Sequence, residues 1–209
     1  MITQLKNILN SKLLVFDFET EGLNLCYTRP WELALDIYDK GKKIESKHTY
    51  IKWKNLKVSK GAAQATGFDP NKVEVLGKDP KLVCDKFFNY IYDESYTIIG
   101  HNILGYDAYI VNVCRRELGY PEDYSFIRRM IDTHALSKAY ELKLRPDESD
   151  DFIAWQYRVM DLKAKGVKTN LAAMCQKFGI EFDKTKLHAA GYDISRNYEV
   201  LRELVKRLN

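Results

Sequence analysis

The stretch LLVFDFETEGLNL (residues 13–25) joins an apolar, strand-like run to two acidic residues and a turn. Alternate residues of a β-strand point to the same side, so Asp17 and Glu19 would place two carboxylates on one face of this strand. Two carboxylates held so close repel each other, and a multivalent cation relieves the repulsion. The sequence therefore predicts a metal site where the first strand ends.

Two later segments supply more groups of the same kind. Asp107 ends IIGHNILGYD (98–107), a second strand-like run that leads into a loop. His188 and Asp193 lie in HAAGYD (188–193), where a long C-terminal helix is expected to begin. An all-oxygen set of four carboxylates suits Mg²⁺ or Mn²⁺ rather than zinc, and a histidine can move a proton at neutral pH. Together they predict a two-metal phosphodiester hydrolase.

The ordered set of motifs resembles the DEDD superfamily of 3′→5′ exonucleases, in its DnaQ-like, histidine-containing (DEDDh) branch. That family has a D-x-E at a strand end, an H-N-x-x-x-D segment after a strand, and an H-x4-D motif. The matches in this sequence are Asp17-Phe18-Glu19-Thr20, then His101-Asn102 leading to Asp107 over a slightly longer gap, then His188 with Asp193. An Asp-Thr pair, usual between the last two motifs, is matched by Asp132-Thr133. The resemblance covers roughly residues 10–208, apart from 141–168.

This resemblance implies a role for each matched residue. Asp17 would bridge two Mg²⁺ or Mn²⁺ ions, Glu19 and Asp193 would complete the ion on the nucleophile side, and Asp107 would hold the other ion. His188 would be the general base that accepts a proton from the attacking water. Asp132 is not expected to bind metal: we interpret the Asp-Thr pair as ordering the backbone.

The resemblance also implies where substrate binds. In the family, the turn after the first motif, here Thr20, Gly22 and Leu23, receives the terminal nucleotide, and Asn102 matches a polar residue near it. The segment 62–67 resembles one that precedes a conserved turn, with Thr66 in place of the commoner histidine. Basic residues that could contact phosphates are Arg115, Arg116, Arg128, Arg129, Lys163, Lys165 and Lys168. His48 and His134 have no motif around them and are interpreted as structural or exposed.

Hydrophobic periodicity predicts an α/β fold. Strands are expected at 13–18, 32–38, 44–53, 96–100 and 129–133, with a hairpin turn at 39–42, and helices at 80–92, 108–118, 170–178 and 194–208. Sequential strands followed by alternating strands and helices predict an antiparallel meander plus parallel strands, with helices on both faces of the mixed sheet. The ribonuclease-H-like architecture of the DEDD family has this form.

We expect a single domain over residues 1–209, with an atypical insertion at about 141–168. Within this insertion, residues 152–162 could form an amphipathic helix. Two interpretations stay open: a surface excursion whose aromatic side chains pack back on the domain, or a flap over the substrate groove or docking surface for a protein partner.

Composition agrees with these expectations. The net charge of +4 permits nucleic-acid binding without demonstrating it. The absence of a secretory signal and of a long apolar run favours a cytoplasmic protein with no membrane span. The four cysteines, with no C-x-x-C, are expected to be reduced thiols, and no structural zinc site is expected; they are Cys26, Cys84, Cys114 and Cys175.

Three functions remain open on sequence grounds. The favoured one is a 3′→5′ exonuclease that acts on single-stranded DNA or frayed DNA ends and releases nucleoside 5′-monophosphates. The second keeps the chemistry but acts on RNA, like RNase T or oligoribonuclease, because recognition of a 2′-hydroxyl depends on backbone contacts that the sequence does not reveal. The third is a non-catalytic module that binds a partner, and the complete set of five active-site residues argues against it.

Overall fold

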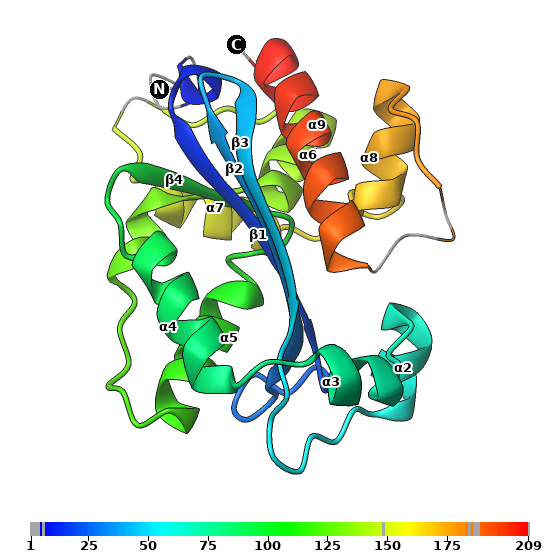
Figure 1. Cartoon of the computed structure of the whole chain (residues 1–209). Helices are drawn as coiled ribbons and strands as arrows, with labels where there is room; N and C mark the ends of the chain where they lie inside the picture. Colours follow the sequence, from blue (N-terminus) through cyan, green and yellow to red (C-terminus); the bar gives the residue numbers. More distant parts are fainter. Residues whose placement is uncertain (1–4, 6, 148, 184, 186–188, 209) are drawn as a thin grey trace.

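The computed structural model describes residues 5, 7–147, 149–183, 185 and 189–208. A five-stranded mixed sheet, in the order β3-β2-β1-β4-β5, forms its centre (Figure 1). Its strands are β1 (Lys12–Thr20), β2 (Pro30–Asp39), β3 (Lys42–Tyr50), β4 (Tyr96–Gly100) and β5 (Met130–Asp132). The predicted mixed α/β sheet is confirmed.

The first three strands form the expected antiparallel meander. β1 pairs with β2 and β2 with β3. A two-residue turn joins β2 to β3, and both of its residues have positive φ, 49° at Lys40 and 75° at Gly41. This geometry matches the twist of a tight hairpin, and glycine adopts it at no steric cost. The turn fixes the register of β3, which decides the side chains that it presents beside β2.

The other two strands extend the sheet in parallel. β4 pairs with β1, and the short β5 pairs with β4. The crossovers contain the helices α4 (Pro80–Ile91) and α5 (Asp107–Glu117), while the 3-10 turn η2 (Ser125–Arg129) leads into β5. Parallel neighbours need such crossovers, which place a helix on the sheet. The carboxyl ends of β1 and β4 consequently lie at the same edge as the N-terminus of α5.

The alternation along β1 divides the apolar core into two layers. Leu14, Phe16 and Phe18 pack under α4 and α5, whereas Leu13 and Val15 face the other layer. That second layer is made by α6 (Thr133–Leu142), α7 (Phe152–Asp161), α8 (Leu171–Phe178) and α9 (Ala190–Leu208). Figure 1 shows α4 and α5 on one side of the sheet and α8 and α9 on the other. Helices therefore cover both faces, as predicted.

In the part of the chain that the structure describes, three helices were not predicted from the sequence: α2 (Lys60–Thr66), α3 (Pro70–Leu76) and α6. The first two have seven residues each and bury little apolar surface, so they show no periodicity. Asp69 before Pro70 was a usable signal, because an N-cap aspartate followed by proline is typical of a helix start. Much of the buried side of α6 consists of small residues such as Ala135 and Ala139, which weaken its hydrophobic pattern.

The segment 141–168 contributes to the core. Trp155 and Val159 on α7 are buried in the layer under α9. Gln156 is fully buried: its side-chain oxygen accepts a hydrogen bond from the N–H of Asp132 at 2.7 Å, and its amide donates to the carbonyl of Met130 at 3.2 Å. Helix α7 therefore covers the open edge of β5. The burial of Trp155 and Val159 favours the interpretation that this stretch packs back on the domain over that of a flap for residues 152–161.

Among the residues that the structure describes, no helix combines the length and the apolar character that crossing a membrane requires.

Candidate active site

Two carboxylates lie on the same face of β1, close to its carboxyl end. Asp17 is opposite Ala34 of β2 and Glu19 is opposite Glu32, and both point toward the layer that contains α9. Glu19 is buried, and Asp17 is half-buried. Phe18 between them and Phe16 before them anchor the strand in the opposite layer. The strand therefore holds its two acidic side chains rigidly in an environment with little water.

Helix α9 brings the third carboxylate to this place. Asp193 lies in its first turn, where the positive end of the helix dipole favours a negative side chain. A carboxylate oxygen of each of Asp17, Glu19 and Asp193 lies within 4.8 Å of the others. Residues 176 positions apart in the sequence thus form one cluster of oxygen donors.

Asp107 joins the cluster from the N-terminus of α5. Its Oδ1 accepts a hydrogen bond of 3.1 Å from the backbone N–H of Phe18, the residue between Asp17 and Glu19. Asp107 is buried, and its burial raises the pKa of its carboxyl to about 7. The structure therefore brings together the four predicted acidic residues that it describes.

Burial and mutual repulsion oppose full ionisation of this cluster. Burial raises the pKa of Glu19 to about 9, assisted by the negative charges of Glu32, Asp193 and Asp107. The pKa of Asp17 is also raised well above its ordinary value, first by burial and then by the charge of Asp107. A divalent cation would relieve both effects, and carboxylate oxygens are the donors that Mg²⁺ and Mn²⁺ prefer. The donor set therefore fits the metal that the motifs imply.

The predicted general base, His188, lies outside the described residues. The third motif is represented in the structure by Asp193 and by Ala189, Ala190 and Gly191, which precede it at the start of α9.

The turn after the first motif is closed by two hydroxyl groups. The hydroxyls of Thr20 and Tyr106 both donate hydrogen bonds to the carbonyl of Gly22, at 2.8 and 2.5 Å. Leu23 then projects into solvent with 88% of its surface exposed, beside a cavity of about 530 Å³. An exposed leucine at a pocket is suited to contact a nucleobase. Tyr106 was missed in the sequence, although its position directly before Asp107 was a signal.

Asp132 has the structural role that was predicted for it. It is fully buried, and its carboxylate accepts hydrogen bonds from the backbone N–H groups of Asn102, Leu104, His134 and Ala135, at 2.8–3.3 Å. It thereby caps α6 and shapes the loop after β4, in which Asn102 has a positive φ of 62°. The backbone position of Asn102, a predicted substrate contact, therefore depends on this carboxylate.

The arginines proposed as phosphate contacts are engaged elsewhere. Arg129 donates to the carbonyls of Asp93, Tyr96 and Ile91, and Arg128 pairs with Asp151. Arg115 lies over the rings of Phe88, Tyr92 and Tyr120, and Arg116 pairs with Glu122. These contacts assign the four arginines to the packing and surface of the fold, so the structure does not favour them as phosphate contacts.

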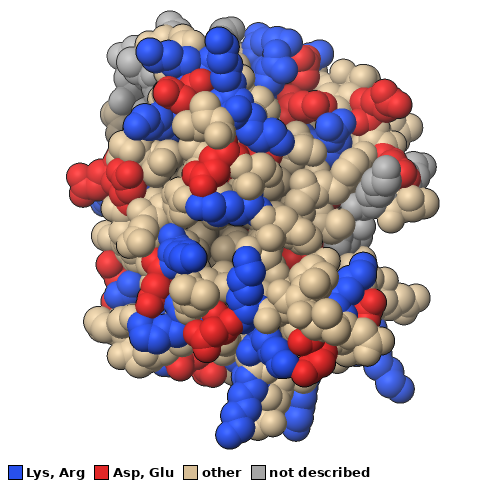
Figure 2. Space-filling view, in the orientation of Figure 1, with Lys and Arg blue, Asp and Glu red and all other residues tan. Residues whose placement is uncertain are grey.

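A basic segment that the sequence reasoning did not single out lies between β3 and α4. Residues 52–78 contain six exposed lysines and two acidic residues. The lysines are Lys52, Lys54, Lys57, Lys60, Lys72 and Lys78. Figure 2 shows Lys and Arg side chains projecting from the lower part of the molecule, around α2 and α3. A cavity of about 330 Å³ separates these helices from the start of α9, and Lys72 lines it.

A mixed five-stranded sheet with clustered carboxylates at its strand ends defines the ribonuclease-H-like class of nucleases. The model of the RNase_T family, described as "Exonuclease", matches residues 14–201. The chain belongs to this exonuclease family, as the motifs predicted. No sequence among curated proteins matches it.

Solved structures of one enzyme share the fold. Escherichia coli exonuclease I in complex with a dT13 oligonucleotide is 19% identical, with a TM-score of 0.75 over 94% of this chain and 41% of that one. The same enzyme with a dA16 oligonucleotide is 21% identical, with a TM-score of 0.72 over 94% of this chain and 41% of that one. Its zinc-bound complex with single-stranded DNA is also 21% identical, with a TM-score of 0.74 over 94% of this chain and 40% of that one. The chain thus spans about two fifths of the length of these proteins, and at such identity the likeness concerns the fold.

Proposed function

We propose that this chain hydrolyses single-stranded DNA, or the frayed 3′ ends of duplex DNA, and releases nucleoside 5′-monophosphates with the aid of two divalent ions. The observation that carries the proposal is the cluster of Asp17, Glu19 and Asp193, with ligand atoms within 4.8 Å of one another and Asp107 beside it. A buried cluster of this kind costs free energy unless cations neutralise it, so its presence in a stable core supports a role in binding them.

Each residue has a proposed part in the reaction. Asp17 would contact both ions, Glu19 and Asp193 would hold the ion on the side of the attacking water, and Asp107 would hold the other. When bound, Mg²⁺ or Mn²⁺ supplies positive charge at the phosphate and an activated nucleophile. His188 would accept the proton of the attacking water, which an imidazole can do near neutral pH.

The surroundings of the cluster support a nucleic-acid end as the substrate. Gly22 and Leu23, closed into a turn by Tyr106, would receive the terminal nucleotide, with Leu23 against its base and Asn102 near its sugar. The exposed lysines of residues 52–78 would attract the phosphates that follow. The DNA complexes of exonuclease I, which shares this fold, favour DNA over RNA as the first substrate to test.

The test is digestion of matched oligonucleotides of DNA and RNA, labelled at the 5′ end, with Mg²⁺ or Mn²⁺. We expect DNA to shorten in steps of one nucleotide from its 3′ end, more slowly when that end is fully paired. Blocking the 3′ end should stop the reaction, while a labelled 3′ nucleotide should appear as a 5′-monophosphate. Faster digestion of RNA would show that RNA rather than DNA is the preferred substrate, with the same hydrolytic mechanism. Cleavage inside a strand whose 3′ end is blocked would contradict the proposal.

A further inference from the structure

Glu32 is a buried carboxylate that lies next to the proposed metal site but belongs to no motif. It is 4% exposed and stands directly opposite Glu19 across the antiparallel pair of β1 and β2. Side chains directly opposite each other in such a pair are neighbours on the same face, and like charges in this position are destabilising. The unfavourable pairing of Glu32 with Glu19 must therefore be offset by another interaction of Glu32 or by a functional role.

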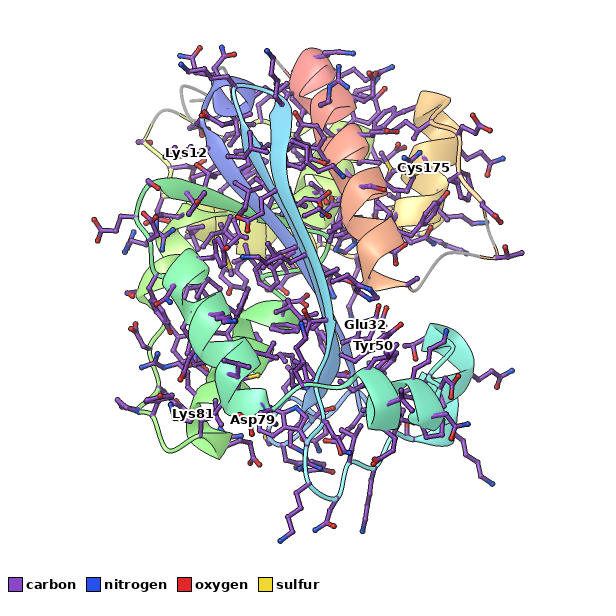
Figure 3. The ribbon with its side chains drawn as sticks, viewed as in Figure 1. Lys12, Glu32, Tyr50, Asp79, Lys81 and Cys175 are labelled. Atoms are coloured by element: carbon purple, nitrogen blue, oxygen red, sulfur yellow. The ribbon has the colours of Figure 1, made fainter. Side chains whose placement is uncertain are left out.

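His48 holds it from the next strand. The Nε2 atom of His48 lies 2.5 Å from Oε1 of Glu32, and the two side chains are diagonal neighbours on β3 and β2. The ring of His48 also packs edge-on against Tyr50, with ring centroids 5.0 Å apart. Figure 3 labels Glu32 and Tyr50 and shows them between the start of α9 and the helices α2 and α3.

The segment of the third motif also lies close to His48. A Cβ atom at Gly191 would lie 4.0 Å from Cδ2 of His48, so the backbone two residues before Asp193 passes close to the imidazole. Across the sheet, His48 pairs with Ala34, and Ala34 pairs with Asp17. His48, through Glu32, therefore stands at the junction of the two segments that bring Glu19 and Asp193 together.

We propose that Glu32, held by His48, is a positioning residue that confines the side chain of the metal ligand Glu19. Because His48 fixes the Glu32 carboxylate on the β2 side, the Glu19 carboxylate is repelled from that side and turned toward Asp17 and Asp193. Glu32 also adds negative charge beside the ligands, and a divalent cation gains more from this charge than a single proton does. The inference rests on the metal site of the proposed function.

Glu32→Gln separates positioning from simple packing. The amide keeps the shape and an oxygen acceptor for His48, but it loses the charge and can donate a hydrogen bond to Glu19. The metal-free variant should therefore melt at a higher temperature than the wild type, while its Kd for Mn²⁺ rises about tenfold, the lower end of what outer-shell substitutions cost. Mn²⁺ binding by isothermal titration calorimetry and melting by circular dichroism measure both quantities without any need for activity.

Variants of His48 test the link between the two residues. His48→Ala frees the Glu32 carboxylate, so its Kd for Mn²⁺ should lie between those of the wild type and Glu32→Gln. His48→Gln, which retains a donor of similar reach, should restore binding to within about twofold of the wild type. In the Glu32→Gln background, His48→Ala should add less than about twofold, because interacting residues are non-additive. Thr49→Ala, a change on the other face of β3, is the control and should bind Mn²⁺ like the wild type.

Each outcome decides between distinct claims. Glu32→Gln that binds Mn²⁺ like the wild type, or that melts at a lower temperature, overturns the positioning role. Equal effects of His48→Ala in both backgrounds overturn the link through Glu32. Failure of the wild-type protein itself to bind Mn²⁺ overturns the proposed metal site, and with it this inference. A further readout is the KM for oligonucleotide, which should stay within about twofold in Glu32→Gln because the proposed nucleotide contacts lie on other residues.

Discussion

The carboxylate of Asp107 accepts a hydrogen bond from the backbone N–H of Phe18, at a distance of 3.1 Å. This bond joins the N-terminus of α5 to the peptide that links Asp17 to Phe18, the one residue between Asp17 and Glu19. It fixes the strand end that carries two acidic side chains to the helix that carries a third. The geometry of the carboxylate cluster therefore depends on backbone as well as on side-chain contacts.

Asp17→Ala should abolish hydrolysis and leave the fold intact. The substitution removes a proposed ligand of both ions, and it also removes one of several mutually repelling carboxylates. The metal-free variant should thus melt at the same temperature as the wild type or higher. Release of 5′-monophosphates and thermal melting check this, and retained activity in pure protein would refute the two-ion proposal.

The stability of the metal-free protein should fall as the pH rises from 6.5 to 9. In this window Glu19 and Asp107 are ionised in the unfolded chain, whereas the fold raises their pKa values to about 9 and about 7. The folded state then binds more protons than the unfolded state, so deprotonation costs stability. Burial lowers the pKa of His101 to about 3, and this shift acts in the opposite sense but below pH 6.5.

Melting curves at several pH values, with and without Mg²⁺, measure this dependence. Glu19→Gln should flatten the curve of metal-free protein above pH 7, and Mg²⁺ should flatten it in the wild type. A melting temperature that rises between pH 6.5 and 9 without metal would contradict the prediction.

His188→Ala should lower turnover by roughly 10²–10⁴, the usual contribution of a positioned general base. The affinity for Mn²⁺ should change little, since the proposed ligands are carboxylates. Single-turnover hydrolysis and calorimetric titration with Mn²⁺ separate the two effects. Loss of Mn²⁺ binding would instead make His188 a metal ligand.

Asp132→Asn should destabilise the fold by about 1–3 kcal/mol, because the amide has one acceptor oxygen where the carboxylate has two, and a buried N–H is left unpaired. Urea unfolding measures the loss, with Asp161→Asn, an exposed aspartate on α7, as the control. A variant with wild-type stability but no Mn²⁺ binding would show that Asp132 is a ligand rather than a backbone cap.

Gln156→Leu should also destabilise the fold by about 1–3 kcal/mol, because the N–H of Asp132 and the carbonyl of Met130 lose their partner at the edge of β5. Arg158, an exposed residue of the same helix, pairs with Asp150 just before it, and Arg158→Ala should cost much less stability because surface ion pairs contribute little. Urea unfolding compares the two variants. Equal stability of Gln156→Leu and wild type would show that these two hydrogen bonds do not help to hold α7 against β5.

The strands, the long helices and the acidic motifs could be predicted because each depends on local pattern. Alternation in residues 13–20 fixes the face of Asp17 and Glu19, and the periodicity of 190–208 fixes the helix that carries Asp193. The family followed from the order of the motifs, and it was confirmed. The short helices α2 and α3 and the alanine-containing helix α6 were not predicted because their apolar patterns are weak.

The sequence by itself determined where the main strands and helices lie and which acidic residues stand at their ends. Hydrophobic periodicity is a local property, so it can be read without knowing which distant segments are in contact. Tertiary structure alone decided which of them meet. It placed Glu32 opposite Glu19 and His48 against Glu32, because strand register depends on a turn outside the motifs. It also engaged four arginines in packing contacts and surface ion pairs and buried Gln156 against β5, because burial and pairing arise only when distant segments of the chain come together.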